Sequence, residues 1–192
     1  MLARLEQLDQ QLFFAINNGW SAPMLDYLFW TLSTFGNGTG MVLGALLWLW
    51  WIDRDTVKRH WAWLILAVLM GAAVMQALKY GIDRPRPLST FAPLLESGQV
   101  HINVVGRALS QRSFPSGHAQ AAASVLTYVG CLYPRYWLGW GAGILLAAIG
   151  RVYVGVHFPS DVIAGAMLGS FSALAVIYLQ TRISEFRMHR LE

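Results

Sequence analysis

The chain has 192 residues, of which 56% are hydrophobic and 12% are charged. Soluble domains carry about 25% charged residues, so this composition and a mean hydropathy of +0.45 exclude an ordinary soluble domain and indicate an integral membrane protein. The net charge of +4 includes no long basic run, which argues against a nucleic-acid partner, and the single cysteine excludes an intrachain disulfide.

The N-terminal region mixes polar and apolar side chains. Residues 1–17 lack the clean apolar core of a signal peptide and predict an amphipathic helix in the membrane interface. Residues 23–34 are apolar but short and contain Asp26, so they predict an interfacial, re-entrant or strained spanning segment. We therefore treat 1–35 as one interfacial or re-entrant segment.

Five further apolar segments reach, or nearly reach, the roughly 20 residues that cross a bilayer. They are 36–52, 61–80, 117–133, 136–152 and 161–181. Since we see no internal repeat and no low-complexity linker, we predict a single domain over 1–192 with an all-α fold. That fold is a polytopic membrane helical bundle with five to six transmembrane helices, whose oligomeric state the sequence does not determine. Two pairs of small residues favour close helix packing. These pairs are Gly139 with Gly143 and Gly165 with Gly169.

The longest segment outside these spans is 81–116, which contains four prolines and four arginines. A loop of this length in a compact protein is usually functional. Basic residues also follow the 36–52 span and end the chain, and the positive-inside rule favours the cytoplasm for those positions. The 81–116 loop is itself basic, so we orient the chain by its histidines and expect a long extracytoplasmic loop and functional face.

Three short motifs lie where spans end or begin at that face. In chain order they are Lys79 to Arg86-Pro87, Pro115-Ser116-Gly117-His118, and Arg151 through His157 to Asp161.

Cations and helix-start groups in these motifs are suited to an anion. Lys79, Arg86 and Arg151 would gather positive charge where few carboxylates are near, and phosphate oxygens match a guanidinium fork. Ser116 occupies an apparent N-cap. Gly117 leaves its backbone N–H open to close approach at a helix N-terminus, where anions bind readily.

The two motif histidines offer complementary chemistry. His157 precedes Phe-Pro and should be extended, which places Asp161 in the first turn of the next helix. Asp161 can accept a hydrogen bond from one ring nitrogen and leave the other free to attack. His118, on a different helix, is then available as a general acid. The sequence therefore predicts phosphoryl transfer without a metal or other cofactor.

Other interpretations of these residues exist. His118, His157 and Asp161 could ligate zinc, although the neighbouring cations would repel it. Single histidines at helix ends are often structural, and basic residues there often snorkel. We predict a local pair between Asp83 and Arg84 in the loop. The remaining histidines are expected to be structural or exposed: His60, His101 and His189.

The three motifs resemble those of the type 2 phosphatidic acid phosphatases: a Lys before Arg-Pro, then Pro-Ser-Gly-His, then Ser-Arg-x5-His-x3-Asp. The resemblance covers about 60–181 and departs at Gly150, which stands where the third motif usually has Ser. It implies metal-independent hydrolysis through a phosphohistidine. His157 would be the nucleophile, Asp161 its partner and His118 the acid. The residues implied to hold phosphate are Lys79, Arg86, Ser116, Gly117 and Arg151.

The short chain and its opening LDQQLFFAIN look like the small bacterial members of this family. Many of these act on undecaprenyl diphosphate, and others act on phosphatidic acid, phosphatidylglycerol phosphate or lipid A. The resemblance implies a multi-pass protein of the bacterial inner membrane, a periplasmic active site and a lipid phosphate substrate. A phosphotransferase, a lipid A phosphatase and a non-catalytic lipid head-group binder remain alternatives.

Overall fold

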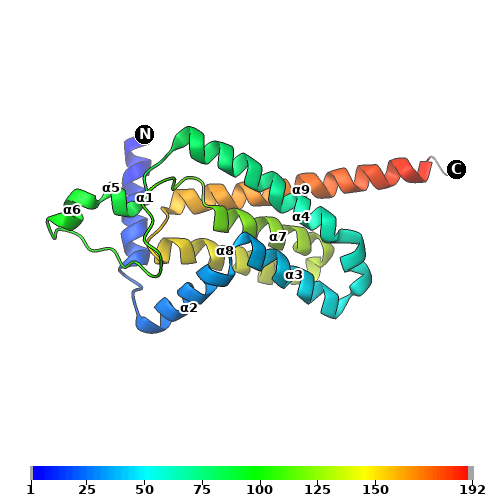
Figure 1. Ribbon diagram of the computed structural model, residues 1–192, viewed down its shortest axis with the longest axis horizontal. Helices are drawn as coiled ribbons and strands as arrows, with labels where there is room; N and C mark the ends of the chain where they lie inside the picture. Colours follow the sequence, from blue (N-terminus) through cyan, green and yellow to red (C-terminus); the bar gives the residue numbers. More distant parts are fainter. Residues whose placement is uncertain (1, 190–192) are drawn as a thin grey trace.

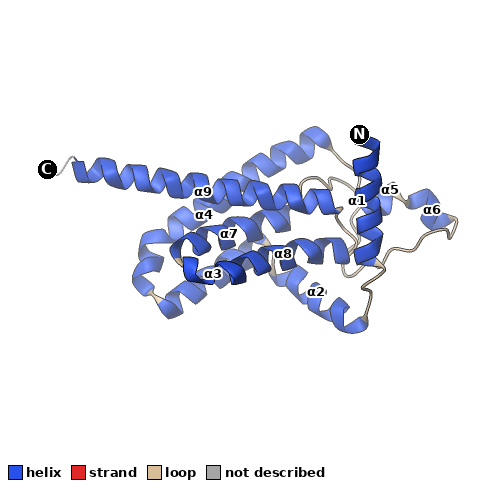
Figure 2. Cartoon of the chain, turned by 180° about the vertical axis from the view of Figure 1, so that it is seen from behind, coloured by secondary structure: helices blue, strands red, loops and turns tan. Residues whose placement is uncertain are grey.

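The computed structural model describes residues 2–189, and that part of the chain is helical and contains no strand (Figures 1 and 2). The helices are α1 (Leu2–Asn17), α2 (Pro23–Phe35), α3 (Gly38–Ile52), α4 (Arg54–Ile82), α5 (Pro87–Thr90), α6 (Ala92–Glu96), α7 (Gly117–Leu132), the 3-10 turn η1 (Pro134–Tyr136), α8 (Trp137–Tyr153) and α9 (Pro159–His189). The all-α prediction is therefore confirmed.

By length and composition alone, fewer helices qualify as membrane spans than the five or six that the sequence predicts. Among the described residues, two helical stretches are long and apolar enough to cross a bilayer, within 54–96 and 159–188. Helices α2 and α3 meet the same test as a pair bent by 84°, which is a broken span or a re-entrant loop. Helices α7 and α8 have 16 and 17 residues. Five or six spans thus stays a prediction.

Helix α4 begins earlier than the predicted span at 61. The side chain of Asp53 caps it, because Oδ1 accepts the backbone N–H of Asp55 at 3.0 Å and of Thr56 at 3.1 Å. Such a cap satisfies N–H groups that have no partner within the helix. The basic residues expected in a loop therefore lie on the first turns of α4, beginning with Arg54.

Helix α7 lies inside the bundle and contacts α3, α4, α8 and α9. Glycines allow α9 to approach it closely. A Cβ at Gly165 would lie 2.4 Å from the carbonyl oxygen of Ser116, and one at Gly169 would lie 2.1 Å from that of Gln120. Close packing is confirmed for this pair. In the other predicted pair it is confirmed for Gly143, where an added Cβ would lie 2.9 Å from Cδ1 of Leu126, and wrong for Gly139, where an added Cβ meets nothing within 4 Å. The start of α7 is therefore held against the first turns of α9.

Helix α1 crosses the end of the bundle instead of running along it (Figures 1 and 2). Asp9, Phe13 and Asn17 are spaced four residues apart, are buried and face α8 and α9. The outward face carries leucines that are each more than half exposed: Leu5, Leu8 and Leu12. Polar residues of α1 thus face the bundle while its leucines face outward. This arrangement favours the predicted interfacial position, because the leucines would otherwise face water.

We predict that Gly169→Ala destabilises the protein while Gly139→Ala does not. The first change places a methyl group against the α7 backbone, and overpacking of this kind costs about 1–3 kcal/mol. The second adds a methyl group in open space, where the better helix propensity of Ala contributes up to about 1 kcal/mol. Melting temperatures in detergent test this pair, and equal shifts would contradict the close approach of α7 and α9.

Candidate active site

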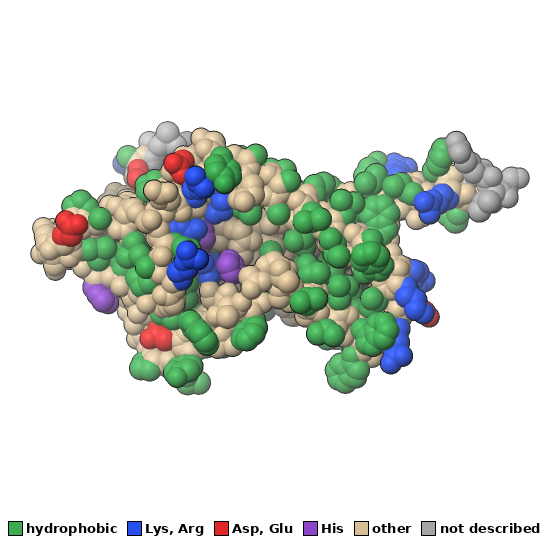
Figure 3. Space-filling view, viewed as in Figure 1, with side chains coloured by type: hydrophobic (Ala, Val, Ile, Leu, Met, Phe, Trp, Pro, Cys, Tyr) green, Lys and Arg blue, Asp and Glu red, His purple; other side chains and the backbone are tan. Residues whose placement is uncertain are grey.

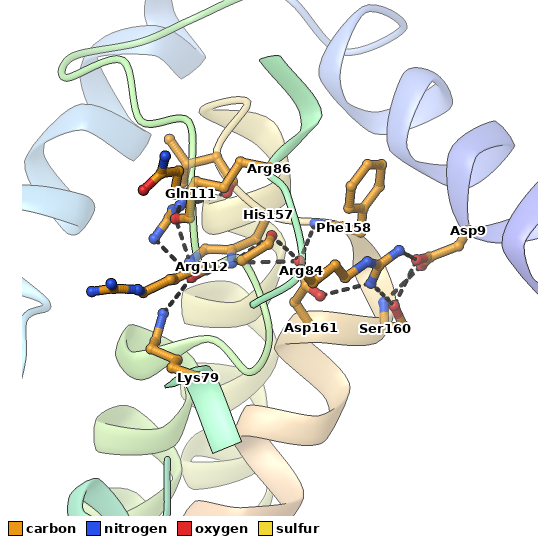
Figure 4. A network of polar contacts seen from close by, with 12 residues as sticks. Asp9, Lys79, Arg84, Arg86, Gln111, Arg112, His157, Phe158, Ser160 and Asp161 are labelled. Carbon is orange, nitrogen blue, oxygen red and sulfur yellow. Dashed lines mark hydrogen bonds and ion pairs between the residues drawn. The ribbon is translucent and has the colours of Figure 1, made fainter. Parts of the chain in front are cut away.

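The fully buried carboxylate of Asp161, in the first turn of α9, receives donors from three other segments (Figure 4). Arg84 Nη1 donates to Oδ1 at 2.7 Å. The backbone N–H of Phe158 donates to Oδ2 at 2.8 Å, and the hydroxyl of Ser113 donates to the same oxygen. His157 Nδ1 lies 3.6 Å from Oδ2. The carboxylate is thus held in one orientation beside the imidazole.

His157 occupies the short connection between α8 and α9 and is 2% exposed. Arg86 Nη1 lies 3.4 Å from its Nε2. Because a guanidinium has only donors, this contact requires an unprotonated Nε2, which puts the proton on Nδ1, facing Asp161. Burial lowers the pKa of the imidazole from 6.5 to about 3, and the charges of Arg86 and Arg151 act in the same direction. The ring is therefore neutral, with the Nε2 lone pair available.

Lys79 and Arg86 converge on one carbonyl group. Lys79 Nζ donates to the carbonyl oxygen of Arg112 at 2.8 Å, and Arg86 Nη2 donates to the same oxygen at 3.4 Å. Arg86 is further held by Nε donating to the Gln111 carbonyl at 2.7 Å and Nη1 donating to that of Val156 at 3.0 Å. The structure thus brings these two predicted cations together, with Arg86 beside His157.

Ser116 is the N-cap of α7 by position, but its side chain makes no capping hydrogen bond. Its Oγ is buried and has no hydrogen-bond partner among the described residues, while its backbone N–H donates to the Asp161 carbonyl at 2.9 Å. The first intrahelical donor of α7 is the N–H of Gln120, so the N–H groups of Gly117 and His118 precede it. The start of α7 therefore has the N–H groups and the hydroxyl from which an anion site was predicted.

His118 and Arg151 meet at Ser33, near the end of α2. His118 Nε2 lies 3.2 Å from the Ser33 carbonyl oxygen, and Arg151 Nη1 donates to the Ser33 hydroxyl. A carbonyl only accepts hydrogen bonds, so His118 carries its proton on Nε2. Arg151 is 7% exposed, and its Nε is buried without a partner among the described residues. The Nε2–H of His118 is therefore directed at Ser33.

Two hollows share Ser33, His118 and Arg151 among their lining residues. One is a cleft of about 210 Å³ whose apolar walls include Leu32, Met41, Leu126 and Leu146. The other is a cavity of about 320 Å³ that is also lined by Trp30, Thr34 and Arg107. Lys, Arg and His side chains gather in a hollow near the α1 end, while hydrophobic side chains cover much of the middle of the molecule (Figure 3).

The glycine that departs from the third motif has a packing reason. A Cβ at Gly150 would lie 2.9 Å from Cδ1 of Phe29, so the missing side chain lets α2 pack on α8. That contact brings Ser33 of α2 to Arg151. The family motif usually has a Ser at this position, and in this chain a hydroxyl from another helix, that of Ser33, lies at Arg151.

Near the site, the structure gives Arg84 a different partner from the one predicted, and it adds Ser113 and Ser33, which were not predicted. The predicted pair of Asp83 with Arg84 is wrong, because Arg84 bonds to Asp161, and Asp83 instead lies 3.6 Å from Arg112. Ser113 and Ser33 were not predicted, because each is brought to the site by helix packing and not by a local motif. The Arg-Pro-Arg-Pro repeat at 84–87 is the sequence signal that could have indicated Arg84.

The zinc alternative finds no ligand set in the described part of the chain. No group of three or more His, Cys, Asp or Glu side chains there is arranged to hold a metal ion. His118 faces Ser33 instead of His157, and Asp161 is occupied by Arg84. These residues are arranged for hydrogen bonding and not for coordination.

A family model described as the PAP2 superfamily matches residues 60–185, which include all three motifs. The chain belongs to the PAP2 superfamily. The Lipid A 1-phosphatase of Rhizobium johnstonii is 34% identical over 124 residues, covering 60% of this chain and 46% of that protein. The Undecaprenyl-diphosphatase of Sulfolobus acidocaldarius is 30% identical over 123 residues, covering 62% and 54%. This PAP2 chain spans about half the length of these curated relatives.

A solved structure supports the same relationship. The crystal structure of Aquifex aeolicus LpxE aligns with a TM-score of 0.71 and 30% sequence identity, covering 89% of this PAP2 chain and 95% of that chain. The predicted family is therefore confirmed, and the helical arrangement is similar to that of a solved protein over nearly its whole length.

The low pKa of His157 predicts that the free energy of unfolding decreases as the pH is lowered below 6.5. The unfolded imidazole binds a proton as the pH drops through 6.5, whereas the folded one stays neutral down to about 3. The stabilising contribution is therefore complete above the unfolded value and is lost as the pH falls through this window, by at most about 1.4 kcal/mol per pH unit. Between about pH 7 and pH 5, wild type should lose more melting temperature than His157→Gln. Equal losses would contradict a buried, neutral His157.

Proposed function

We propose that this chain hydrolyses a phosphate ester or diphosphate of a membrane lipid through a phosphohistidine at His157. The observation that carries the proposal is that Ser116 Oγ and Arg151 Nε, in two of the predicted phosphate-binding residues, are buried with no hydrogen-bond partner among the described residues. Buried polar groups are nearly always hydrogen-bonded, so an unpaired hydroxyl and guanidinium nitrogen indicate a ligand with several acceptor oxygens. A phosphoryl group has this property.

In the first step, His157 Nε2 attacks phosphorus, and the bond from phosphorus to the lipid oxygen breaks. Asp161 stabilises the charge that develops on the ring through Nδ1–H. His118 reacts as the imidazolium, which a bound anionic phosphate favours, and gives one of its two ring protons to the departing oxygen. Positive charge and donors at the phosphoryl oxygens favour the transition state. They come from Lys79, Arg86, Ser116, Gly117 and Arg151.

In the second step, water attacks the phosphorus atom and the bond to His157 Nε2 breaks. His118, deprotonated by the first step, takes the proton of the attacking water. Inorganic phosphate is released and both histidines return to their starting forms. None of these steps requires a metal or a cofactor, because the chain itself supplies the nucleophile, the acid and the cations.

The two hollows support a lipid substrate. The apolar cleft is lined in part by His118 and Arg151 and would take part of a hydrocarbon chain, and the cavity that shares these residues and also contains Arg107 would take a head group. Undecaprenyl diphosphate or a phosphatidic-acid-like lipid is the proposed substrate. The relatives' names give a lipid A phosphate equal support.

The proposed location is the bacterial inner membrane with the site facing the periplasm. Two basic regions, the start of α4 and the last turns of α9, lie at the end of the bundle opposite α1, α5 and α6 (Figure 1). The positive-inside rule supports a cytoplasmic position for that end. The site then lies on the other side, at the depth of lipid phosphates.

The proposal predicts phosphate release that resists EDTA. Wild type, His157→Ala and His101→Ala would be compared in detergent on undecaprenyl diphosphate, phosphatidic acid and a lipid A phosphate. We expect release by wild type and by His101→Ala, which alters an exposed histidine. His157→Ala should lose at least about 10³-fold, because the nucleophile is absent.

Three outcomes would contradict parts of the proposal. Release of phosphate by His157→Ala would contradict a phosphohistidine intermediate at His157. Phosphate transfer to an acceptor lipid, with no free phosphate in its absence, would indicate a phosphotransferase. Binding of the lipids without turnover would indicate a head-group binder.

A further inference from the structure

Arg84, in the loop after α4, joins two carboxylates (Figure 4). Its Nη1 donates to Asp161 Oδ1 and to Ser160 Oγ, each at 2.7 Å. Its Nη2 donates to Asp9 Oδ2 at 2.8 Å. The guanidinium carbon also lies 4.4 Å from the centre of the Phe158 ring. These contacts fix Arg84 on both sides and leave its side chain 24% exposed.

Asp9 attaches α1 to the same place. Its Oδ1 accepts the backbone N–H of Ser160 at 2.8 Å, and its Oδ2 accepts the Ser160 hydroxyl at 2.6 Å. One turn further, the fully buried Phe13 packs on Phe158, with ring centres 5.5 Å apart. Helix α1 is therefore fastened to the residues between His157 and Asp161.

The Asp161 carboxylate depends on this attachment for its orientation. Among the described residues, only Arg84 donates to Oδ1, while Ser113 and Phe158 hold Oδ2. A carboxylate held at both oxygens cannot rotate about its last bond. Arg84 is also the countercharge in direct contact with this buried anion, which would otherwise be costly to bury.

We propose that Arg84 is a positioning residue for phosphoryl transfer and that Asp9 of the crossing helix α1 holds Arg84 in place. The inference rests on the proposed function, since it assigns Asp161 a role in orienting His157. It makes α1 part of the catalytic arrangement, although none of its residues reaches the phosphate site. The amphipathic helix thereby couples its docking on the bundle to the tautomer of the nucleophile.

The kinetic test compares Arg84→Gln, Arg84→Lys, Asp9→Asn and the double variant Asp9→Asn/Arg84→Gln. We expect kcat to fall by about 10- to 100-fold in Arg84→Gln and by less in Asp9→Asn, as is common for residues that orient a catalytic group. Arg84→Lys should recover part of the loss, because it keeps the charge. The double variant should be no slower than Arg84→Gln, since Asp9 acts through Arg84.

Binding should change little in these variants, because the phosphate ligands are untouched. KM and inhibition by inorganic phosphate should stay within roughly twofold of wild type. The matched control is Arg182→Gln, which removes an exposed arginine paired with Glu185 at 3.3 Å, far along α9. An unchanged kcat in Arg84→Gln would overturn the proposal. Weaker phosphate inhibition with a melting temperature below that of Arg182→Gln would also overturn it, as a merely structural role. Additive losses in the double variant would overturn the part assigned to Asp9.

A second readout does not depend on turnover. Nitrogen-15 NMR of histidine-labelled protein, with the His157 signals assigned by His157→Ala, reports which ring nitrogen carries the proton. We expect Nδ1–H in wild type and a mixture of tautomers in Arg84→Gln. If no lipid is hydrolysed but the tautomer depends on Arg84, the proposed function fails and the positioning of the imidazole stands. If wild type is active and neither tautomer nor kcat responds to Arg84→Gln, the positioning fails and the function stands.

Discussion

A buried carboxylate is the constraint on which the catalytic end of this protein depends. Removing a charge from water is costly unless donors and a countercharge replace the solvent. For Asp161 the replacement comes from Arg84 after α4, Ser113 before α7 and the backbone of Phe158 before α9. The Asp161 carbonyl also accepts the N–H of Ser116 at the start of α7. One residue therefore ties together the ends of three helices that carry the site.

The same arrangement explains how a histidine can remain a nucleophile among cations. Burial and the charges of Arg86 and Arg151 keep the His157 ring neutral, and the facing acceptor assigns its proton to Nδ1. The cations that suppress protonation of the ring are also those that would neutralise a bound phosphate. Positive charge thus contributes to both the attraction of an anion and, after burial, the availability of the lone pair.

The surroundings of the site suit a substrate that is partly in the bilayer. The molecule is hydrophobic over the middle of its surface, while its polar hollow lies toward the end crossed by α1 (Figures 1 and 3). The apolar cleft and the larger cavity, which also contains Arg107, share the residues Ser33, His118 and Arg151. A molecule with a hydrocarbon chain on one side of its phosphate and a head group on the other matches this layout.

The sequence predicted the site residues that belong to short local motifs and missed those that reach the site only through the tertiary structure. The three motifs stand at helix ends, so the histidines and most of the cations proposed for the site could be predicted from the sequence. Arg84 was misassigned because Asp83 has φ of 44° and ends α4 in a left-handed turn, which directs the chain toward α9. Ser33 belongs to a helix whose position follows from a glycine at 150 and a phenylalanine at 29. Neither the turn at Asp83 nor the contact between Gly150 and Phe29 leaves a periodic pattern in the sequence from which it could be predicted.

The most direct test of the account is to trap the covalent intermediate. Wild type and His157→Ala would be mixed with a lipid carrying a radioactive phosphate, quenched in alkali within milliseconds to seconds, and analysed for label on the protein. The account predicts label on wild type that survives alkali, is lost in acid and maps to His157, and no label on His157→Ala. Turnover by wild type with no labelled protein at any time, or label at another residue, would contradict it.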